Sequence, residues 1–261
     1  MVAPGVVARV MQRRMRIELH GSVALLHLES GKVNAMGPGF VSDLNRLLDG
    51  LADASAAVIT GQGSVFSAGL DLPGLIDLDQ PSMHRFMEGF NTLMLRLFEL
   101  PIPLVAAING HAIAGGCVLA LQADLRLVAD RDARIGLNEA QLGIGLPAAV
   151  LETLRCQVPG SSLAPIALEG RLFSPREALA LGLVHEVVPE AELQAKALQR
   201  AQALAQLPPA GVRQIKAALR RPVAESIRAI SSAESQRWVA SWLDPASQSR
   251  LRAAIAKLKK T

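Results

Sequence analysis

The stretch FSAGLDL, residues 66–72, places three of the smallest side chains at the end of an apolar run. Packing at the end of a buried strand normally favours large side chains, so Ser67, Ala68 and Gly69 need another explanation. A second stretch, INGHAIAGGC at residues 108–117, ends another apolar run in the same way. Small residues let another molecule approach the main chain and leave N–H groups free to donate to it. The two stretches therefore predict two turns whose backbone amides are available to a ligand.

A helix is predicted directly after the second stretch. Residues 117–121, CVLAL, are compatible with a helix, so Gly115 and Gly116 are expected at its N-terminus. Free N–H groups and the positive end of the helix dipole coincide there. One N–H from each stretch, aimed at a single carbonyl oxygen, forms an oxyanion hole, in which losing one donor typically costs roughly 3 to 4 kcal/mol. By itself, the pattern is also typical of two tight turns that let helices pack closely.

The two stretches together resemble the crotonase (enoyl-CoA hydratase/isomerase) superfamily, which has F-x-A-G-x-D in the first stretch and N-G-x-x-x-G-G-x in the second. The resemblance covers the chain from about residue 15 to the last predicted helix, with Ala114 where the first of three glycines is common. Matched by position, it implies that the backbone N–H groups of Leu70 and Gly115 are the oxyanion donors. It also implies that Asp71 caps or braces the turn. The substrate-binding residues that it implies here are Ala68, Gly69, Asp71, His111 and Gly116.

Proton transfer needs an acid or a base, and the resemblance indicates one. Enoyl-CoA hydratases use two glutamates around one water molecule. The first lies three residues after the middle glycine, where this chain has Val118, which cannot exchange a proton. The second lies in a P-E-x-x-L-G stretch, matched by Glu139 with Leu142 and Gly143, while Asn138 replaces the common proline. We expect burial to raise the pKa of Glu139 and Leu142 to line the substrate site; the alternative is that Glu139 is a solvated loop acid.

One carboxylate beside an oxyanion hole suits a 1,3-proton shift. Glu139 would remove a proton from the carbon next to a thioester and return it two carbons further along. The resemblance is therefore to Δ3,Δ2-enoyl-CoA isomerases of the mitochondrial type, enzymes of fatty-acid β-oxidation. Hydration by a single carboxylate, thioester hydrolysis and decarboxylation stay open. A non-catalytic RNA-binding homologue is disfavoured, because only 3% of the residues are aromatic and none is Tyr.

Several other residues have both a functional and a structural interpretation. His111 either touches the ligand or belongs to the turn. Ala35 lies in GKVNAM, residues 31–36, which corresponds either to the family segment that lines the pantetheine channel or to an ordinary turn. Cys117 and Cys156 are expected to be reduced packing residues, because neither belongs to a Cys-x-x-Cys pair or a Cys/His cluster. We therefore predict no metal site and no separate cofactor, since coenzyme A would be part of the acyl-CoA thioester substrate.

The pattern of strands and helices indicates an α/β fold, and the resemblance implies a crotonase-like spiral of ββα units with a C-terminal helical segment. Residues 15–30 predict a hairpin that turns at residues 20–22. Further strands are predicted from apolar runs at residues 56–61, 103–110, 125–129, 133–135 and 184–188.

Helices are predicted between these strands. Apolar residues recur every three to four positions in residues 39–52 and 82–99. Ser174 and Glu177 form a capping box for a helix that ends at Gly182.

We predict a core of residues 1–192, in which the residues before Met15 form a flexible tail, and a helical segment of residues 193–261. Pro208-Pro209, Pro222 and Pro245 are expected to break this segment into separate helices. The resemblance implies that it forms homotrimers or dimers of trimers.

Composition limits the classes of partner. The chain has 261 residues, of which 50% are hydrophobic and 19% charged, with a net charge of +4. The basic residues are scattered, which suits a small anionic ligand and not a nucleic acid. No apolar run is long enough to span a bilayer, and the first residues lack the charge order of a secretory signal. We therefore expect a cytoplasmic protein that binds neither nucleic acid nor membrane.

Overall fold

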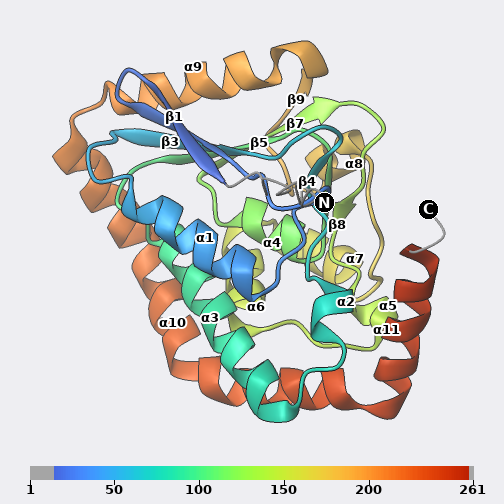
Figure 1. Cartoon of the computed structure of the whole chain (residues 1–261). Coiled ribbons are helices and arrows are strands. Elements are labelled where there is room, and N and C mark those ends of the chain that lie inside the picture. The colour runs from blue at the N-terminus through green and yellow to red at the C-terminus, as the bar shows by residue number, and fades with distance from the viewer. Residues whose placement is uncertain (1–14, 259–261) are drawn as a thin grey trace, which may run out of the picture.

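The computed structural model describes residues 15–258, which form an α/β fold on two sheets (Figure 1). The larger sheet has six strands in the order β1-β2-β3-β5-β7-β9, in which β1 is antiparallel to β2 and every other pair is parallel. Its strands are β1 (Arg16–His20), β2 (Val23–His27), β3 (Ala56–Thr60), β5 (Leu104–Ile108), β7 (Leu125–Asp130) and β9 (Glu186–Pro189). The expected hairpin at residues 15–30 is confirmed as β1 and β2.

The smaller sheet is parallel and consists of β4 (Val65–Ser67), β6 (His111–Ile113) and β8 (Ile135–Gly136). The chain runs from β3 to β4, from β5 to β6 and from β7 to β8, so each step takes it from the large sheet to the small one. Each of these pairs is followed by helix. The expected spiral of ββα units is therefore confirmed.

Eleven α-helices occur within the described residues. They are α1 (Pro38–Asp49), α2 (Leu72–Leu75), α3 (Gln80–Phe98), α4 (Gly115–Leu121), α5 (Glu139–Leu142), α6 (Ala148–Gln157), α7 (Leu163–Ala167), α8 (Pro175–Ala180), α9 (Leu193–Ala205), α10 (Pro209–Leu243) and α11 (Pro245–Leu258). The helices expected at residues 39–52 and 82–99 are α1 and α3. The expected capping box precedes α8, where Ser174 and Glu177 bond reciprocally, and Gly182 follows with φ +76°.

The large sheet separates two layers of helices. Figure 1 shows α9 on one side of it and α1, α3 and α4 on the other. The strand residues alternate accordingly: Val58 packs in a cluster with Leu193 and Ala197 of α9, while Ile59 belongs to the main core. Residues 193–258 are helical as expected, but α9 shares a hydrophobic core with the sheet.

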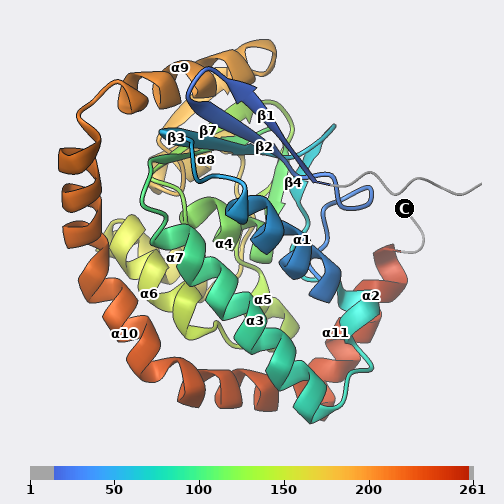
Figure 2. The same ribbon diagram turned by 60° about the vertical axis from the view of Figure 1, so that its left-hand side comes forward.

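Several expectations of element boundaries are corrected. The strand expected at residues 133–135 is β8, and the one expected at residues 184–188 is β9. Pro222 does not break the C-terminal segment, because α10 runs through it. Pro222 lacks the N–H that would bond the carbonyl of Ala218, so a bend is favoured over a break. Figure 2 shows α10 curving around the body of the molecule, where it packs on α3 and α6.

A buried ionic cluster holds α10 to the sheet layer one turn before Pro222. Asp124 binds Lys216 Nζ through Oδ2 and Arg220 Nη2 through Oδ1, each at 2.6 Å. Its Oδ2 also accepts the Leu104 N–H at 2.8 Å. The guanidinium of Arg220 lies 4.0 Å from the centre of the Phe98 ring, a cation–π contact. These contacts anchor α10 in the stretch of helix that precedes Pro222.

Two further sequence expectations concern the surface and the start of the chain. Cys156 is exposed, so its assignment as a packing residue is wrong, whereas Cys117 is buried as expected. The flexible tail expected before Met15 lies outside the described residues. Between residues 15 and 258, no helix is both long enough and apolar enough to cross a membrane.

Candidate active site

The two glycine stretches leave neighbouring strands of the small sheet. Because β4 and β6 are parallel, their carboxyl ends lie at the same edge and the segments that follow them meet. Gly69 has φ +88°, and a Cβ added there would lie 2.7 Å from the Ile113 carbonyl oxygen and 3.0 Å from the Gly115 nitrogen. A Cβ at Gly116 would lie 2.1 Å from the Ser67 carbonyl oxygen. The small residues are therefore required by the contact between the two main chains.

The backbone around Leu70 turns its N–H away from the neighbouring segment. Met36 N–H donates to the Gly69 carbonyl at 2.8 Å, and Asp71 N–H donates to the Met36 carbonyl at 3.1 Å. In such a parallel bridge, the N–H of the residue between the two bonds points to the other side. Within residues 15–258, no hydrogen bond uses the N–H of Leu70 or of Gly115. The two amides that the sequence assigns to an oxyanion hole are thus close together and unused.

Asp71 and α4 complete this part of the site. Asp71 Oδ1 accepts the Gly74 N–H at 3.3 Å and so caps α2, as expected. Gly115 is the first residue of α4, which confirms the expected helix N-terminus beside the turn. Ala114 precedes it with φ +49° and ψ −119°, a conformation that side chains rarely adopt. This conformation explains why the family often has a glycine at the position that Ala114 occupies here.

A brace behind the first stretch was not found from the sequence. Asn34 is fully buried, donates from Nδ2 to the Phe66 carbonyl at 2.9 Å and accepts the Ser30 N–H at 2.8 Å. The Ser67 hydroxyl donates to the Asn34 carbonyl at 2.8 Å. Asn34 has φ +49°, a conformation that Asn tolerates well, so an Asn in a turn was the available signal. Ala35 follows it, half-buried, and its assignment to the pantetheine channel stays a prediction.

The third strand of the small sheet leads to Glu139 from beside Gly69 and Gly115, which we call the glycine pair. Ile113 of β6 is paired with Gly136 of β8, and Ala114 N–H donates to the Gly136 carbonyl at 2.8 Å. Three residues later Glu139 opens α5 with 8% of its surface exposed. Its Oε2 has no hydrogen-bond partner among the described residues. Burial raises the pKa of Glu139 to about 7, slightly opposed by a hydrogen bond from its own backbone.

Two residues of α4, Cys117 and Val118, cannot exchange a proton at neutral pH. Burial, with a smaller contribution from the charge of Glu139, raises the pKa of the Cys117 thiol to about 12, so Cys117 is no nucleophile at neutral pH. Val118 is buried and apolar. Of the acidic side chains that the structure describes, Glu139 alone is classed as buried. The arrangement therefore supplies two backbone donors and a single proton-transfer group.

Two candidate residues lie at the margin of this arrangement. Leu142 ends α5 and packs, partly buried, against the main core. His111 begins β6, at the end of the strand away from Ala114, and its Nδ1 accepts the Arg134 N–H at 3.0 Å. That bond matches the structural interpretation of His111. Contact of either side chain with substrate stays a prediction.

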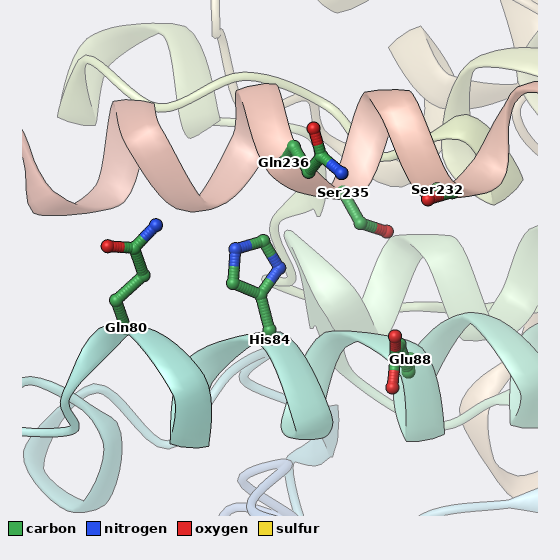
Figure 3. A pocket seen from close by; sticks show the side chains of 6 residues that line it. All are labelled: Gln80, His84, Glu88, Ser232, Ser235 and Gln236. Carbon is green, nitrogen blue, oxygen red and sulfur yellow. The ribbon is translucent and has the colours of Figure 1, made fainter.

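A cavity of about 410 Å³ lies elsewhere, between α3 and α10 (Figure 3). It is lined by Gln80, His84, Glu88, Ser232, Ser235 and Gln236. None of these is one of the candidate residues. The candidate active site that the family resemblance implies, with Gly69, Gly115 and Glu139, therefore lies apart from this cavity.

Comparison with known proteins shows the family of the chain. The profile of the enoyl-CoA hydratase/isomerase family matches residues 18–249. Human mitochondrial enoyl-CoA delta isomerase 1 is 33% identical over 243 residues, 91% of this chain and 80% of that protein. A putative enoyl-CoA hydratase of Thermus thermophilus is 39% identical over 194 residues, 71% of this chain and 74% of the relative. The crystal structure of human mitochondrial Δ3-Δ2-enoyl-CoA isomerase gives a TM-score of 0.90 at 32% identity, over 95% of this chain and 99% of that one.

Proposed function

The chain belongs to the enoyl-CoA hydratase/isomerase family, and we propose that within this family it is a Δ3,Δ2-enoyl-CoA isomerase that works with a single acid. The family acts on acyl-CoA thioesters, which agrees with the net positive charge of the chain. Relatives named as isomerase and as hydratase both match, so the choice between the two reactions has to come from the site.

The observation that carries the proposal is that Glu139 is a buried acid while residue 118 is a buried valine. Hydration by the usual route needs a second carboxylate at position 118, and the side chain there is apolar and buried. A 1,3-proton shift needs one group only, because both carbons of the acyl chain can face the same carboxylate.

The reaction is a proton transfer that leaves the thioester intact. The Glu139 carboxylate removes a proton from C2 of a 3-enoyl-CoA, and the electron pair delocalises into a dienolate. Its oxygen would accept hydrogen bonds from the N–H groups of Leu70 and Gly115, which is how backbone donors stabilise developing charge. The neutral Glu139 then returns the proton to C4, giving the conjugated 2-enoyl-CoA. The net change is a shift of one double bond, and no cofactor beyond the coenzyme A of the substrate takes part.

A carboxyl group with a pKa near the working pH suits both halves of this reaction. At a pKa of about 7, Glu139 is ionised often enough to accept the C2 proton and acidic enough to return it. A solvated glutamate, with a pKa near its ordinary value of 4.5, would be a much weaker base. Burial therefore contributes directly to the proposed function.

The test is to incubate the purified protein with 3-enoyl-CoA and with 2-enoyl-CoA separately. We expect conjugated thioester from the first and little 3-hydroxyacyl-CoA from the second. Glu139→Gln should lower kcat by about a hundredfold or more. Glu225→Gln, at an exposed acid of α10, is the matched control and should leave kcat unchanged. Rapid hydration of 2-enoyl-CoA would favour the hydratase alternative, and full activity of Glu139→Gln would reject Glu139 as the base.

The assembly and location of the protein remain proposals as well. We propose that the C-terminal helices form trimers or dimers of trimers, supported by Ile215 and Leu219, which lie one turn apart on α10 and are 58% and 70% exposed. Sedimentation velocity of the protein and of Ile215→Lys tests this proposal. If the assembly of the variant has the same mass as that of the wild type, the α10 face with Ile215 and Leu219 is not the interface. The cytoplasmic location stays a prediction.

A further inference from the structure

The C-terminal helix α11 lies against both parts of the active site. It packs on α2, which follows the first glycine stretch, and on α5, which begins with Glu139 (Figure 1). Arg252 of α11 pairs with Asp77, just beyond α2, at 2.8 Å. The last helix of the chain therefore connects two segments that carry different parts of the chemistry.

One buried serine of α11 hydrogen-bonds to Gly143, the residue that caps the end of α5. Ser247 is 2% exposed, and its hydroxyl donates to the Gly143 carbonyl at 2.8 Å. Its N–H donates to Asp244 Oδ2 at 3.1 Å, which caps the start of α11. Gly143 has φ +78°, and a Cβ added there would lie 2.8 Å from Ser247 Oγ. The position of Gly143 is thus fixed closely by Ser247.

This contact matters because α5 is only one turn long. A helix of residues 139–142 cannot be stable by itself, and the carbonyls at its end have no partners inside the helix. Gly143 is the C-cap of α5, and Ile144 N–H returns to the Glu139 carbonyl at 3.2 Å. Two residues after the cap, Gly145 N–H donates to Ser241 Oγ at 3.1 Å. The turn that carries Glu139 is therefore held from outside, by the C-terminal segment.

We propose that Ser247 is a positioning residue for Glu139. The hydroxyl of Ser247 fixes the α5 turn, so that Glu139 stays beside the glycine pair and shielded from water. The proposal rests on the proposed function in that it takes Glu139 as the proton-transfer group. It extends that function to the C-terminal helix, which becomes part of the active site without touching the substrate.

Other charged and titratable groups near α5 do not offer a simpler explanation. Cys117 of α4 faces Glu139 but stays protonated. Arg250 of α11 lies near Gly143, with Nη1 3.1 Å from the position of an added Cβ. Glu169 and Arg171, on the segment that Gly170 places against α5, pair with each other at 3.5 Å. The protonation of Glu139 is set by burial, which α11 helps to maintain.

The experiment compares Ser247→Ala with Ser249→Ala, an exposed serine two residues along the same helix. In Ser247→Ala we expect kcat to fall about tenfold, the scale of a slightly misplaced catalytic group, with little change in KM. The acidic limb of the kcat/KM profile should move to lower pH, because a looser α5 admits water to Glu139. Carboxyl 13C NMR of Glu139, assigned with Glu139→Gln, should show the same shift. Ser249→Ala should match the wild type in all three measurements.

Two further variants protect the test against misfolding. Ser247→Cys keeps the side-chain volume but donates weakly, so it should shift the pH profile in the same direction as Ser247→Ala. Gly143→Ala pushes on Ser247 Oγ, and adding Ser247→Ala to it should restore part of the lost kcat, because the nearest clash is removed.

The outcomes separate this proposal from the proposed function. If the wild type hydrates 2-enoyl-CoA and does not isomerise, the proposed function fails, and the pH profile of hydration together with the NMR titration still tests Ser247. If the wild type isomerises but Ser247→Ala and Ser247→Cys keep the wild-type pH profile and NMR titration, Ser247 does not position Glu139 and this proposal is overturned.

Discussion

Gly69 and Gly115 approach so closely that a methyl group on Gly69 would lie 3.0 Å from the Gly115 amide nitrogen. In the proposed mechanism, Leu70, the residue after Gly69, provides one oxyanion donor, and Gly115 provides the other. The distance between the two donors is therefore set by main-chain contact, and it leaves no room for a side chain.

The first prediction concerns this contact. Gly69→Ala should lower kcat by about a hundredfold or more, because the added methyl group separates the two donors. Gly63→Ala is the matched control: its φ is also positive, at +57°, but nothing lies within 4 Å of an added Cβ. Both variants should lose some stability through backbone strain, and only Gly69→Ala should lose activity. Equal kcat values in the two variants would contradict the assignment.

The second prediction is that Glu139 makes stability depend on pH. The carboxyl binds its proton more tightly in the folded protein, with a pKa of about 7, than in the unfolded chain, where it has the ordinary pKa of 4.5. The free energy of unfolding should therefore fall between these two pH values as pH rises, and the loss should be complete above the folded pKa. Glu139→Gln removes the ionisation and should gain about 3 kcal/mol over the wild type at alkaline pH.

Urea unfolding of the wild type, Glu139→Gln and Glu225→Gln at about pH 5 and about pH 8.5 measures this difference. The advantage of Glu139→Gln should grow with pH, while Glu225→Gln follows the wild type because that acid is exposed. An advantage that shrinks with pH would mean that Glu139 is stabilised as the anion.

The third prediction concerns the strained residue before α4. Ala114 has φ +49° and ψ −119°, and non-glycine residues in such conformations carry about 1 to 3 kcal/mol of strain. Ala114→Gly should therefore raise the free energy of unfolding by about 1 kcal/mol after the entropy cost of glycine is included. Ala120→Gly, inside the same helix, should be destabilising. Denaturant midpoints decide the sign, and a less stable Ala114→Gly would show that the strain is relieved by its surroundings.

The fourth prediction concerns the ionic cluster under α10. Asp124→Asn leaves Lys216 and Arg220 buried without a counter-charge and should cost about 3 to 5 kcal/mol. Arg252→Ala breaks the exposed pair with Asp77 and should cost less than about 1 kcal/mol. Thermal unfolding of both variants measures the contrast. Similar small losses would mean that the two cations reach water when Asp124 is replaced.

The glycine stretches could be interpreted from the sequence because the reasons for their composition are local. A Cβ at Gly116 would overlap the Ser67 carbonyl. Such close backbone contact requires small residues, and a run of small residues is visible in the sequence. The capping box at Ser174 is local in the same sense, since both of its hydrogen bonds join residues three positions apart. Glu139 could be proposed from the sequence because the family resemblance matched a short motif around it, and its burial agrees with the expectation.

Features that depend on partners far along the chain were not predicted. Asn34 braces Phe66, Asp124 binds Lys216, and Ser247 holds Gly143, and no local pattern reports these pairings. The strands β4 and β6, of three residues each, are too short to show a period. Pro222 was expected to end a helix because its local preference is strong, but packing of α10 on α3 and α6 overrides it.

Each of the three strands of the small sheet is followed by a segment that contains one group of the proposed mechanism. The segment after β4 brings Leu70, that after β6 brings Gly115, and that after β8 brings Glu139. Since each group is encoded in its own segment, a substitution behind one strand can alter the reaction while the other two stay in place.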